Sequence, residues 1–288
     1  MGKIEIKNVT YTYSKDTPFE KAALKDVSAV FEDNRITGLI GHTGCGKSTL
    51  VQLFNGLLVP DCGEVLIDGV NVSAKGTDKR ALRFRVGLVF QYPEYQLFEE
   101  TVAADIAFGP KNMGLDDGEI KRRTLEALKF VGLPPTILSE SPFDLSGGQK
   151  RRVAIAGVLA MEPEVLVLDE PAAGLDPAGR DSIFGGIREY QKETGRSVII
   201  VSHSMEDMAE YTDDIVVMQE GRVKASGRTK DIFRQREMLE EAGLSVPGIT
   251  LFMTELKRKG GGIDVGVFTV SDAFEEIKKY VEGVKKQC

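Results

Sequence analysis

The chain has 288 residues and a formal net charge of -7, with 42% hydrophobic and 28% charged residues. These proportions are ordinary for a water-soluble globular protein with one large domain or two smaller ones. The acidic balance argues against nucleic acid as the main partner, and no apolar run reaches the length of a membrane span. We also expect no secretory leader, because the first residues lead straight into an alternating strand pattern.

Cysteine and histidine are too few for a metal site of their own. The three cysteines, Cys45, Cys62 and Cys288, are odd in number and lack metal-ligand spacing, and the two histidines are His42 and His203. A reducing cytoplasm fits this cysteine usage best.

The N-terminal part predicts an antiparallel strand pair. Apolar and polar residues alternate over 3–11 and 24–33, with a turn-rich link at 13–18 between them. A short buried strand at 36–40 follows, and 48–56 reads as a helix closed by glycine.

The middle of the chain predicts a parallel sheet with an inserted helical part. Residues 63–69 read as another strand that ends in a turn, and apolar runs typical of buried strands occupy 86–90, 165–168 and 197–201. Such strands, with a helix expected at 178–193 between the last two, imply a mainly parallel sheet covered on both faces. The segment from about 92 to 163 is mostly helical in pattern and reads as an inserted subdomain. After residue 221 we expect helices at 229–241, 249–257 and 271–285.

The segment that follows the strand at 36–40 matches the phosphate-binding pattern G-x-x-x-x-G-K-[ST]. It reads Gly41-His42-Thr43-Gly44-Cys45-Gly46-Lys47-Ser48-Thr49. Its glycines let backbone N–H groups converge on phosphate oxygens, and the following helix adds its partial positive charge. Lys47 can reach the β- and γ-phosphates, and the Ser48 hydroxyl can ligate Mg²⁺. The sequence therefore predicts a nucleotide site here.

A second phosphate-binding surface is predicted at Leu145-Ser146-Gly147-Gly148-Gln149, which opens an amphipathic helix through residue 160. The two glycines expose N–H groups at the helix start, and Ser146 adds a hydroxyl. A protein with two such segments does not usually use both on one nucleotide from the same chain.

Polar residues follow three of the predicted buried strands. Asp169 is placed to hold Mg²⁺, directly or through water, and Glu170 to orient and polarise an attacking water. His203 follows the next strand, near where a γ-phosphate would lie. Gln91 ends the strand at 86–90.

These pieces occur in the order found in the ATPase subunit of ATP-binding cassette (ABC) transporters, which the chain resembles from residue 3 to about 226. The matching residues are Tyr13, Gly41–Thr49, Gln91, Leu145–Gln149, Val165–Glu170, Ala173–Asp176 and His203. The resemblance implies an α/β P-loop NTPase cassette with a mainly parallel sheet, an antiparallel β subdomain, an inserted helical subdomain and a small C-terminal helical extension. We thus expect a nucleotide-binding domain at 1–226 and a mostly helical extension at 227–288.

The resemblance also implies roles for single residues. Tyr13 would stack on adenine, with Tyr11 as the competing candidate. Gln91 would contact Mg²⁺ or the attacking water, unless it only ends a strand. His203 would bond the γ-phosphate, unless it is a structural histidine.

In that family two cassettes pack head to tail, so that each ATP lies between one chain's phosphate loop and the other chain's Ser146–Gln149 segment. Asp176 would lie in the loop that crosses to the other subunit, and it can also cap a helix, because Pro177 follows. Water attacks the γ-phosphate in line, while Mg²⁺, Lys47 and the signature glycines stabilise the charge. The implied cofactors are ATP and Mg²⁺.

Three segments resemble the energy-coupling factor (ECF) importers in particular, namely 90–102, 105–112 and 171–180. That group serves vitamin uptake and, in close relatives, cobalt or nickel uptake; another ABC importer is the alternative. The implied partners are a second ABC ATPase, identical or related, a membrane coupling protein and a membrane substrate-binding subunit, at the cytoplasmic face of the cell membrane. The extension would add to the ATPase dimer contact.

Two further hypotheses concern single features. An apolar groove rimmed by acids would receive a membrane protein's arginine-bearing helix, unless its aromatics are subdomain core; it comprises Tyr92, Tyr95, Leu97 and Phe98, with Glu94, Glu99 and Glu100. Cys45 is either a neutral substitution or, beside Lys47 at a helix N-terminus, a reactive thiol of lowered pKa.

Three other classes of ABC protein fit less well. Chromosome-handling members carry coiled-coil arms or zinc inserts between the two glycine motifs, but about a hundred residues lie there, without heptads or cysteine pairs. Translation-associated members have two cassettes, and one is present. A non-hydrolysing cassette would not be expected to keep Glu170, His203 and the intact signature.

Overall fold

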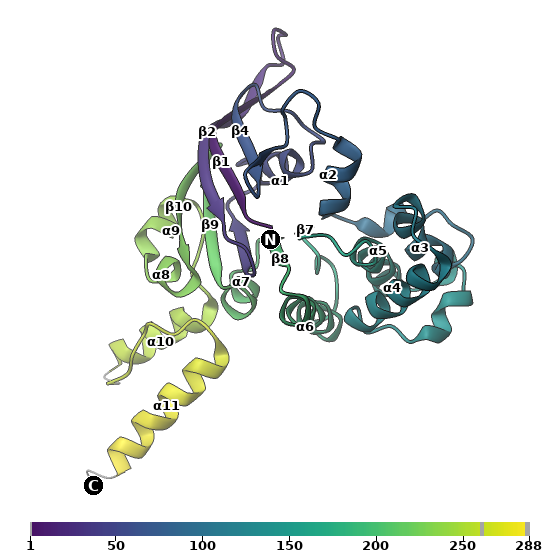
Figure 1. Cartoon of the computed structure of the whole chain (residues 1–288). Helices are drawn as coiled ribbons and strands as arrows, with labels where there is room; N and C mark the ends of the chain where they lie inside the picture. Colours follow the sequence, from purple (N-terminus) through teal and green to yellow (C-terminus); the bar gives the residue numbers. More distant parts are fainter. Residues whose placement is uncertain (1, 260–261, 286–288) are drawn as a thin grey trace.

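The structure is a computed structural model that describes residues 2–259 and 262–285. Cys288 lies outside the described residues. Within them the chain forms two sheets, a group of helices to one side and a helical C-terminal part on the other (Figure 1). No helix of the described part is long and apolar enough to cross a membrane.

The larger sheet has six strands in the order β10-β9-β3-β8-β7-β6. Their bounds are β3 (Ile36–Ile40), β6 (Val86–Val89), β7 (Val165–Asp169), β8 (Ser197–Val201), β9 (Asp214–Gln219) and β10 (Arg222–Arg228). All neighbours pair in parallel except β9 and β10, which form an antiparallel edge. The predicted, mainly parallel sheet is confirmed.

The smaller sheet is antiparallel, with the order β2-β1-β4-β5. It comprises β1 (Ile4–Tyr13), β2 (Lys21–Phe31), β4 (Cys62–Ile67) and β5 (Val70–Asn71). Ile4 and Ile6 lie opposite Phe31 and Ala29, and all four side chains are buried. The alternation seen in the sequence thus produces a half-buried sheet.

Two apolar cores cover the faces of the parallel sheet. Leu166 and Leu168 of β7 belong to one core, while Val165 and Val167 belong to the other, which also holds α1 (Lys47–Phe54) and the antiparallel sheet. Since successive side chains of a strand point to opposite faces, this division explains the continuous apolar run of β7.

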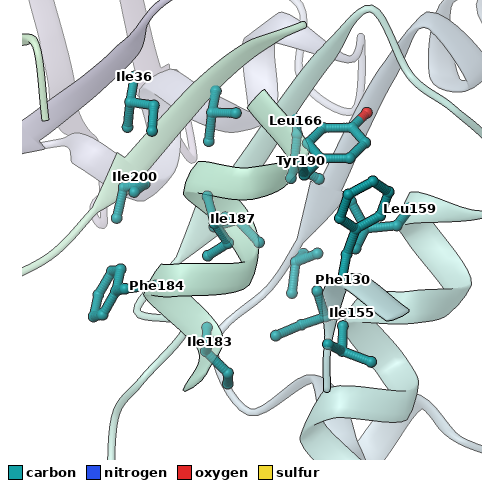
Figure 2. Close-up of a cluster of buried hydrophobic side chains, with 14 of the residues drawn as sticks. Ile36, Phe130, Ile155, Leu159, Leu166, Ile183, Phe184, Ile187, Tyr190 and Ile200 are labelled. Carbon is teal, nitrogen blue, oxygen red and sulfur yellow. The ribbon is translucent and has the colours of Figure 1, made fainter. Parts of the chain in front are cut away.

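The first core joins the sheet to α6 (Pro177–Thr194) and to the helical subdomain (Figure 2). Figure 2 shows Phe184 and Ile187 of α6 directed at the strands and Tyr190 beside Phe130. The Tyr190 and Phe130 rings meet edge to face with centroids 5.3 Å apart, and the buried Tyr190 hydroxyl donates to the Pro163 carbonyl oxygen at 3.3 Å. This contact ties the subdomain to the sheet domain.

The inserted subdomain is helical, as the sequence indicates, and lies on the side away from the antiparallel sheet (Figure 1). It contains α3 (Val102–Asn112), α4 (Asp117–Phe130) and α5 (Gly147–Leu159), with 3₁₀ helices η1 (Pro93–Gln96), η2 (Pro135–Ser139) and η3 (Pro142–Asp144). Asp116 caps α4 by accepting a bond from the Glu119 N–H at 3.1 Å.

The C-terminal part differs from prediction at one place. The helix expected at 229–241 is two short helices, α8 (Thr229–Phe233) and α9 (Arg236–Glu241), because Gln235 leaves the helical region at φ -89°, ψ 59°. The break lets Ile232, Phe233 and Leu239 all enter the first core. Helices α10 (Gly248–Arg258) and α11 (Val270–Lys285) follow and share a small apolar cluster. Four further elements were not predicted from the sequence: α2 (Lys79–Arg85), α7 (Met205–Tyr211), β9 and β10.

At Gly186, α6 packs tightly against the helical subdomain. A methyl group at this position would overlap the Phe130 carbonyl oxygen, whereas one at Gly185 would meet no heavy atom within 4 Å. We expect Gly186→Ala to lower the free energy of unfolding by about 1–3 kcal/mol through overpacking. Gly185→Ala should leave it unchanged or raise it by up to about 1 kcal/mol, since alanine favours helix.

Urea unfolding of the two variants checks this expectation. Equal stabilities would show that the two helices can separate at Gly186 without cost.

Candidate nucleotide-binding site

Four parallel strands bring the predicted groups to one edge of the sheet. The glycine loop follows β3, Gln91 follows β6, Glu170 follows β7 and His203 follows β8. They meet at a cleft of about 480 Å³, lined by Tyr13, Lys21, Ala23, Thr43, Gly44, Gly46, Lys47, Ser48, Thr49, Gln91, Asp169, Glu170 and His203. Lys21 and Ala23, at the start of β2, are lining residues that no motif indicates.

Glycine is required at Gly46, which caps the N-terminus of α1. Its φ of 109° is in the left-handed region, and a Cβ there would stand 2.7 Å from the Ala23 carbonyl oxygen. The loop can therefore turn into α1 against β2 only with a residue that lacks a side chain.

The Lys47 ammonium points back along the loop. Nζ donates to the carbonyl oxygens of Gly41 at 2.6 Å and His42 at 3.1 Å, and the side chain is buried. These bonds hold the cation within the loop, beside the N–H groups that would bind phosphate.

Ser48 and Asp169 supply a pair of oxygen ligands. The Ser48 hydroxyl donates to Asp169 Oδ2 at 2.9 Å, and burial raises the pKa of Asp169. Hydroxyl and carboxylate oxygens are hard donors, and Mg²⁺ usually takes one or two protein ligands together with phosphates and waters. The pair therefore fits Mg²⁺ bound with a nucleotide, and Gln91 lines the same cleft.

Glu170 is held in a conformation that few non-glycine residues adopt. Its φ is 52°, and its N–H donates to the Val201 carbonyl oxygen at 2.9 Å. Carboxyl atom Oε1 is buried without a hydrogen-bond partner, and His203 Nε2 lies 3.4 Å away. Burial first, and the neighbouring Asp169 second, raise the pKa of Glu170 to about 7. A carboxylate of this basicity can accept a proton from water near neutral pH.

His203 is half-exposed beside Glu170. Burial, and then the charge of Lys47, hold the pKa of His203 below its ordinary value. A neutral imidazole has one donor and one acceptor nitrogen, so it can bond a phosphate oxygen without adding charge.

The structure places Tyr13 and Tyr11 differently. Tyr13 lines the cleft, and its hydroxyl lies 3.1 Å from Thr49 Oγ1. Tyr11 is not among the lining residues and packs edge to face on Tyr13, with centroids 4.9 Å apart. The geometry favours Tyr13 over Tyr11 as the residue that contacts the adenine ring, and the stacking itself stays a prediction.

The second glycine motif is not part of this cleft. Ser146, Gly147, Gly148 and Gln149 open α5 on the helical subdomain, where Ser146 and Gln149 form a reciprocal capping box. Asp176 is also outside the cleft and caps α6 by accepting from the Gly179 N–H at 2.7 Å. One chain therefore presents two separate phosphate-binding surfaces.

Two hypotheses about single residues are wrong. Burial raises the pKa of Cys45 and outweighs Lys47, because the thiol is 1% exposed and belongs to the second core. Glu94 is not free for a partner's arginine, since it pairs with Arg151 of its own chain. The aromatics beside it are not core either, since Tyr95 is 85% and Phe98 56% exposed. Leu97, also expected in the groove, is instead buried in the first core.

A shallower cleft beside the first one involves the C-terminal part. His42 and His203 line it together with residues 243–246 and Gly248. The Gly248 N–H donates to Glu206 Oε1 at 3.1 Å, and Glu206 lies on α7, which follows His203. The extension thus contacts the histidine side of the site.

Comparison with known proteins agrees with this geometry. Residues 24–173 match the ABC transporter family. The chain is 52% identical over 284 residues to the energy-coupling factor transporter ATP-binding protein EcfA2 of Clostridium acetobutylicum, with 98% of this chain and 99% of that protein covered. The protein of the same description from Caldanaerobacter subterraneus subsp. tengcongensis is 49% identical over 282 residues, with coverage of 98% and 99%.

Solved structures share the fold. CbiO1 from Clostridium perfringens, part of the ABC transporter complex CbiONQ, superposes with a TM-score of 0.73 at 41% identity, over 83% of this chain and 93% of that one. The cassette MJ0796, in a dimeric post-hydrolysis state with ADP and Pi, gives 0.70 at 29% identity, over 78% and 98%.

The cleft is therefore that of an ATP-hydrolysing cassette, as its loop, carboxylates and histidine indicate. Within that class, the chain belongs to the energy-coupling factor group of ABC transporter ATPases. The fold and the family expected from the sequence are both confirmed.

The two described cysteines should differ sharply in reactivity. Cys62 is exposed and Cys45 is buried with a raised pKa. Because the thiolate is the reactive form, a maleimide should modify Cys62 at least about tenfold faster than Cys45.

Peptide mass spectrometry over a labelling time course measures both rates. The Cys62→Ser variant is the control, because any label it takes up cannot come from Cys62. Rapid modification of Cys45 in the folded protein would restore the reactive-thiol interpretation.

Proposed function

We propose that this cassette closes head to tail on a second copy, or on a related cassette, with two ATP molecules between them. The observation that supports this is the separation of the two phosphate-binding surfaces. The loop at 41–49 lines the cleft, while Ser146–Gln149 opens a helix outside it. A second chain can supply the missing surface to each cleft, and hydrolysis would then release the pair.

Each cleft residue has a task in this proposal. Lys47 would move from the loop carbonyls to the β- and γ-phosphates, while Ser48, Asp169 and Gln91 would hold Mg²⁺, which neutralises phosphate charge when bound. Glu170 would take the proton of the attacking water. His203 would bond the γ-phosphate, and Tyr13 would stack on adenine.

The exposed aromatic residues of the helical subdomain suggest where the cassette contacts a membrane protein. Tyr95, Phe98 and Phe108 are exposed, and the rings of Phe98 and Phe108 meet edge to face with centroids 4.9 Å apart. With Glu99 and Glu100 beside them, they suit an apolar helix that carries arginine. We assign this surface to a membrane coupling protein at the cytoplasmic face of the cell membrane.

The transported molecule is proposed from family membership. ECF transport would use this ATPase for uptake of a vitamin or similar micronutrient, bound by a membrane substrate-binding subunit. The alternative is an ATPase subunit of a cobalt, nickel or other ABC importer; the structural neighbour CbiO1 is itself part of an ABC transporter complex, CbiONQ. Helices α10 and α11 expose Phe252 and Phe274, which would add to the ATPase dimer contact.

Glu170→Gln should keep ATP binding and lose hydrolysis. The variant retains the shape of the side chain but not its basicity, so kcat should fall by about 10²- to 10⁴-fold. Size-exclusion chromatography with ATP and Mg²⁺ should then show a stable dimer.

Glu164→Gln is the matched control, because Glu164 precedes the same strand and pairs with Arg85 outside the cleft. Substantial steady-state hydrolysis by Glu170→Gln would remove Glu170 from the mechanism. A monomer under these conditions would count against the head-to-tail proposal.

The coupling surface is tested by Tyr95→Ala with Phe98→Ala. Losing two exposed aromatic anchors should weaken co-purification with membrane subunits at least about tenfold, because such anchors dominate docking energies. Phe19→Ala is the control, since Phe19 is 83% exposed on the β1–β2 hairpin.

The measurement is a pull-down from detergent-solubilised membranes, with partners identified by mass spectrometry. Unchanged recovery with intact ATPase activity would place the membrane contact elsewhere. The identified substrate-binding subunit would decide between vitamin and metal-ion uptake.

A further inference from the structure

Arg151 is a buried cation outside the nucleotide cleft. Its side chain is 4% exposed, and that of its partner Glu94 is 16% exposed. Nε and Nη2 donate to the two Glu94 carboxylate oxygens at 3.0 and 2.8 Å, which is a bidentate fork. Burying a guanidinium is unfavourable unless its donors are satisfied, so the surroundings must supply further contacts.

Two more contacts complete the surroundings of Arg151. Nη1 donates to the Ala173 carbonyl oxygen, and the guanidinium lies over the Tyr92 ring, 5.8 Å from its centroid. Glu94 is 57 positions away in sequence and Ala173 is 22 positions away. One planar group thus joins three segments that are distant in sequence.

Each of these segments carries a group used in hydrolysis. Tyr92, with a left-handed φ of 58°, directly follows Gln91. The Ala173 N–H donates to the Glu170 carbonyl oxygen at 3.2 Å, so the Arg151 contact lies on the turn that leaves Glu170. Arg151 itself is on α5, which Ser146 caps.

We propose that Arg151 is a positioning residue for ATP hydrolysis. It holds the Gln91 and Glu170 segments of its own cleft in register with the helix that carries Ser146–Gln149. The part that concerns Ser146–Gln149 rests on the head-to-tail dimer of the proposed function. In that dimer the same guanidinium links the groups around one ATP to the surface offered to the other.

The geometry needs arginine rather than a positive charge alone. A lysine ammonium can meet one carboxylate oxygen, but it cannot form the fork, reach the Ala173 carbonyl and cover the Tyr92 ring together. Arg151→Lys should therefore keep the fold and charge and still loosen the register. Since a displacement of about 1 Å can cost about a hundredfold in rate, we expect kcat to fall about ten- to a hundredfold.

The test measures kcat, KM and binding of a fluorescent ATP analogue in the full-length protein. Arg151→Lys should lower kcat while KM and analogue affinity stay within about twofold, because the phosphate loop and Tyr13 are untouched. Arg122→Met is the matched control: Arg122 also pairs with carboxylates, Glu119, Glu126 and Glu162, but on the outer face of the subdomain. Its kcat should match that of the parent protein.

A second variant guards against unfolding. Glu94→Gln combined with Arg151→Met leaves no orphaned charge, so the protein should stay folded while the register is lost. Its kcat should fall as far as that of Arg151→Met alone, because the two residues act as one unit and their effects are not additive.

An unchanged kcat in the folded double variant, or a rise in KM equal to the fall in kcat, overturns the proposal. Dimer formation by the Glu170→Gln variant, with Arg151 intact, tests the proposed function separately. If that variant dimerises and Arg151→Lys keeps full kcat, only the role of Arg151 is wrong.

Discussion

Parallel pairing of β6, β7, β8 and β3 determines where every reactive group lies, because parallel strands end at the same edge of a sheet. Val201 lies opposite Asp169 on one side and Leu39 on the other. A slip of β7 by one residue in its pairing with β8 would turn the Asp169 side chain to the opposite face of the sheet. The two apolar cores oppose such a slip, since each takes alternate residues of the same strand.

The register is held by apolar burial, but the site itself departs from regular geometry. Glu170 and Tyr92 both adopt left-handed backbone angles directly after or near a strand end. Such conformations persist only where the surroundings over-determine them. At Glu170 these are the bond to Val201 and the turn to Ala173, so the main chain directs the carboxyl into the cleft.

The sequence predicted best where a residue's task is local. The glycine loop, the helix start at Ser146 and the carboxylates at the end of β7 need only their neighbours in the chain, and the structure has them as expected. Prediction failed where a segment distant in sequence determines the partner or the burial of a residue. Nothing near Glu94 in sequence indicates Arg151, and nothing near Cys45 shows that the core will bury its thiol. The polar edge strand β10 has too little apolar alternation to be recognised without its partner β9.

The hydrogen bond from the Gly248 N–H to Glu206 attaches the C-terminal part to α7, beside the nucleotide cleft. Ile232, Phe233, Leu239 and Val246 are members of the first core, so the segment before α10 is built into the domain rather than appended to it; Phe268, after α10, joins the same core. A cassette shortened at the predicted boundary of residue 226 would lose one wall beside His203 and uncover part of that core. Modular exchange of such extensions between relatives would therefore transplant a piece of the catalytic domain's interior, and would succeed only where both proteins have matching cores.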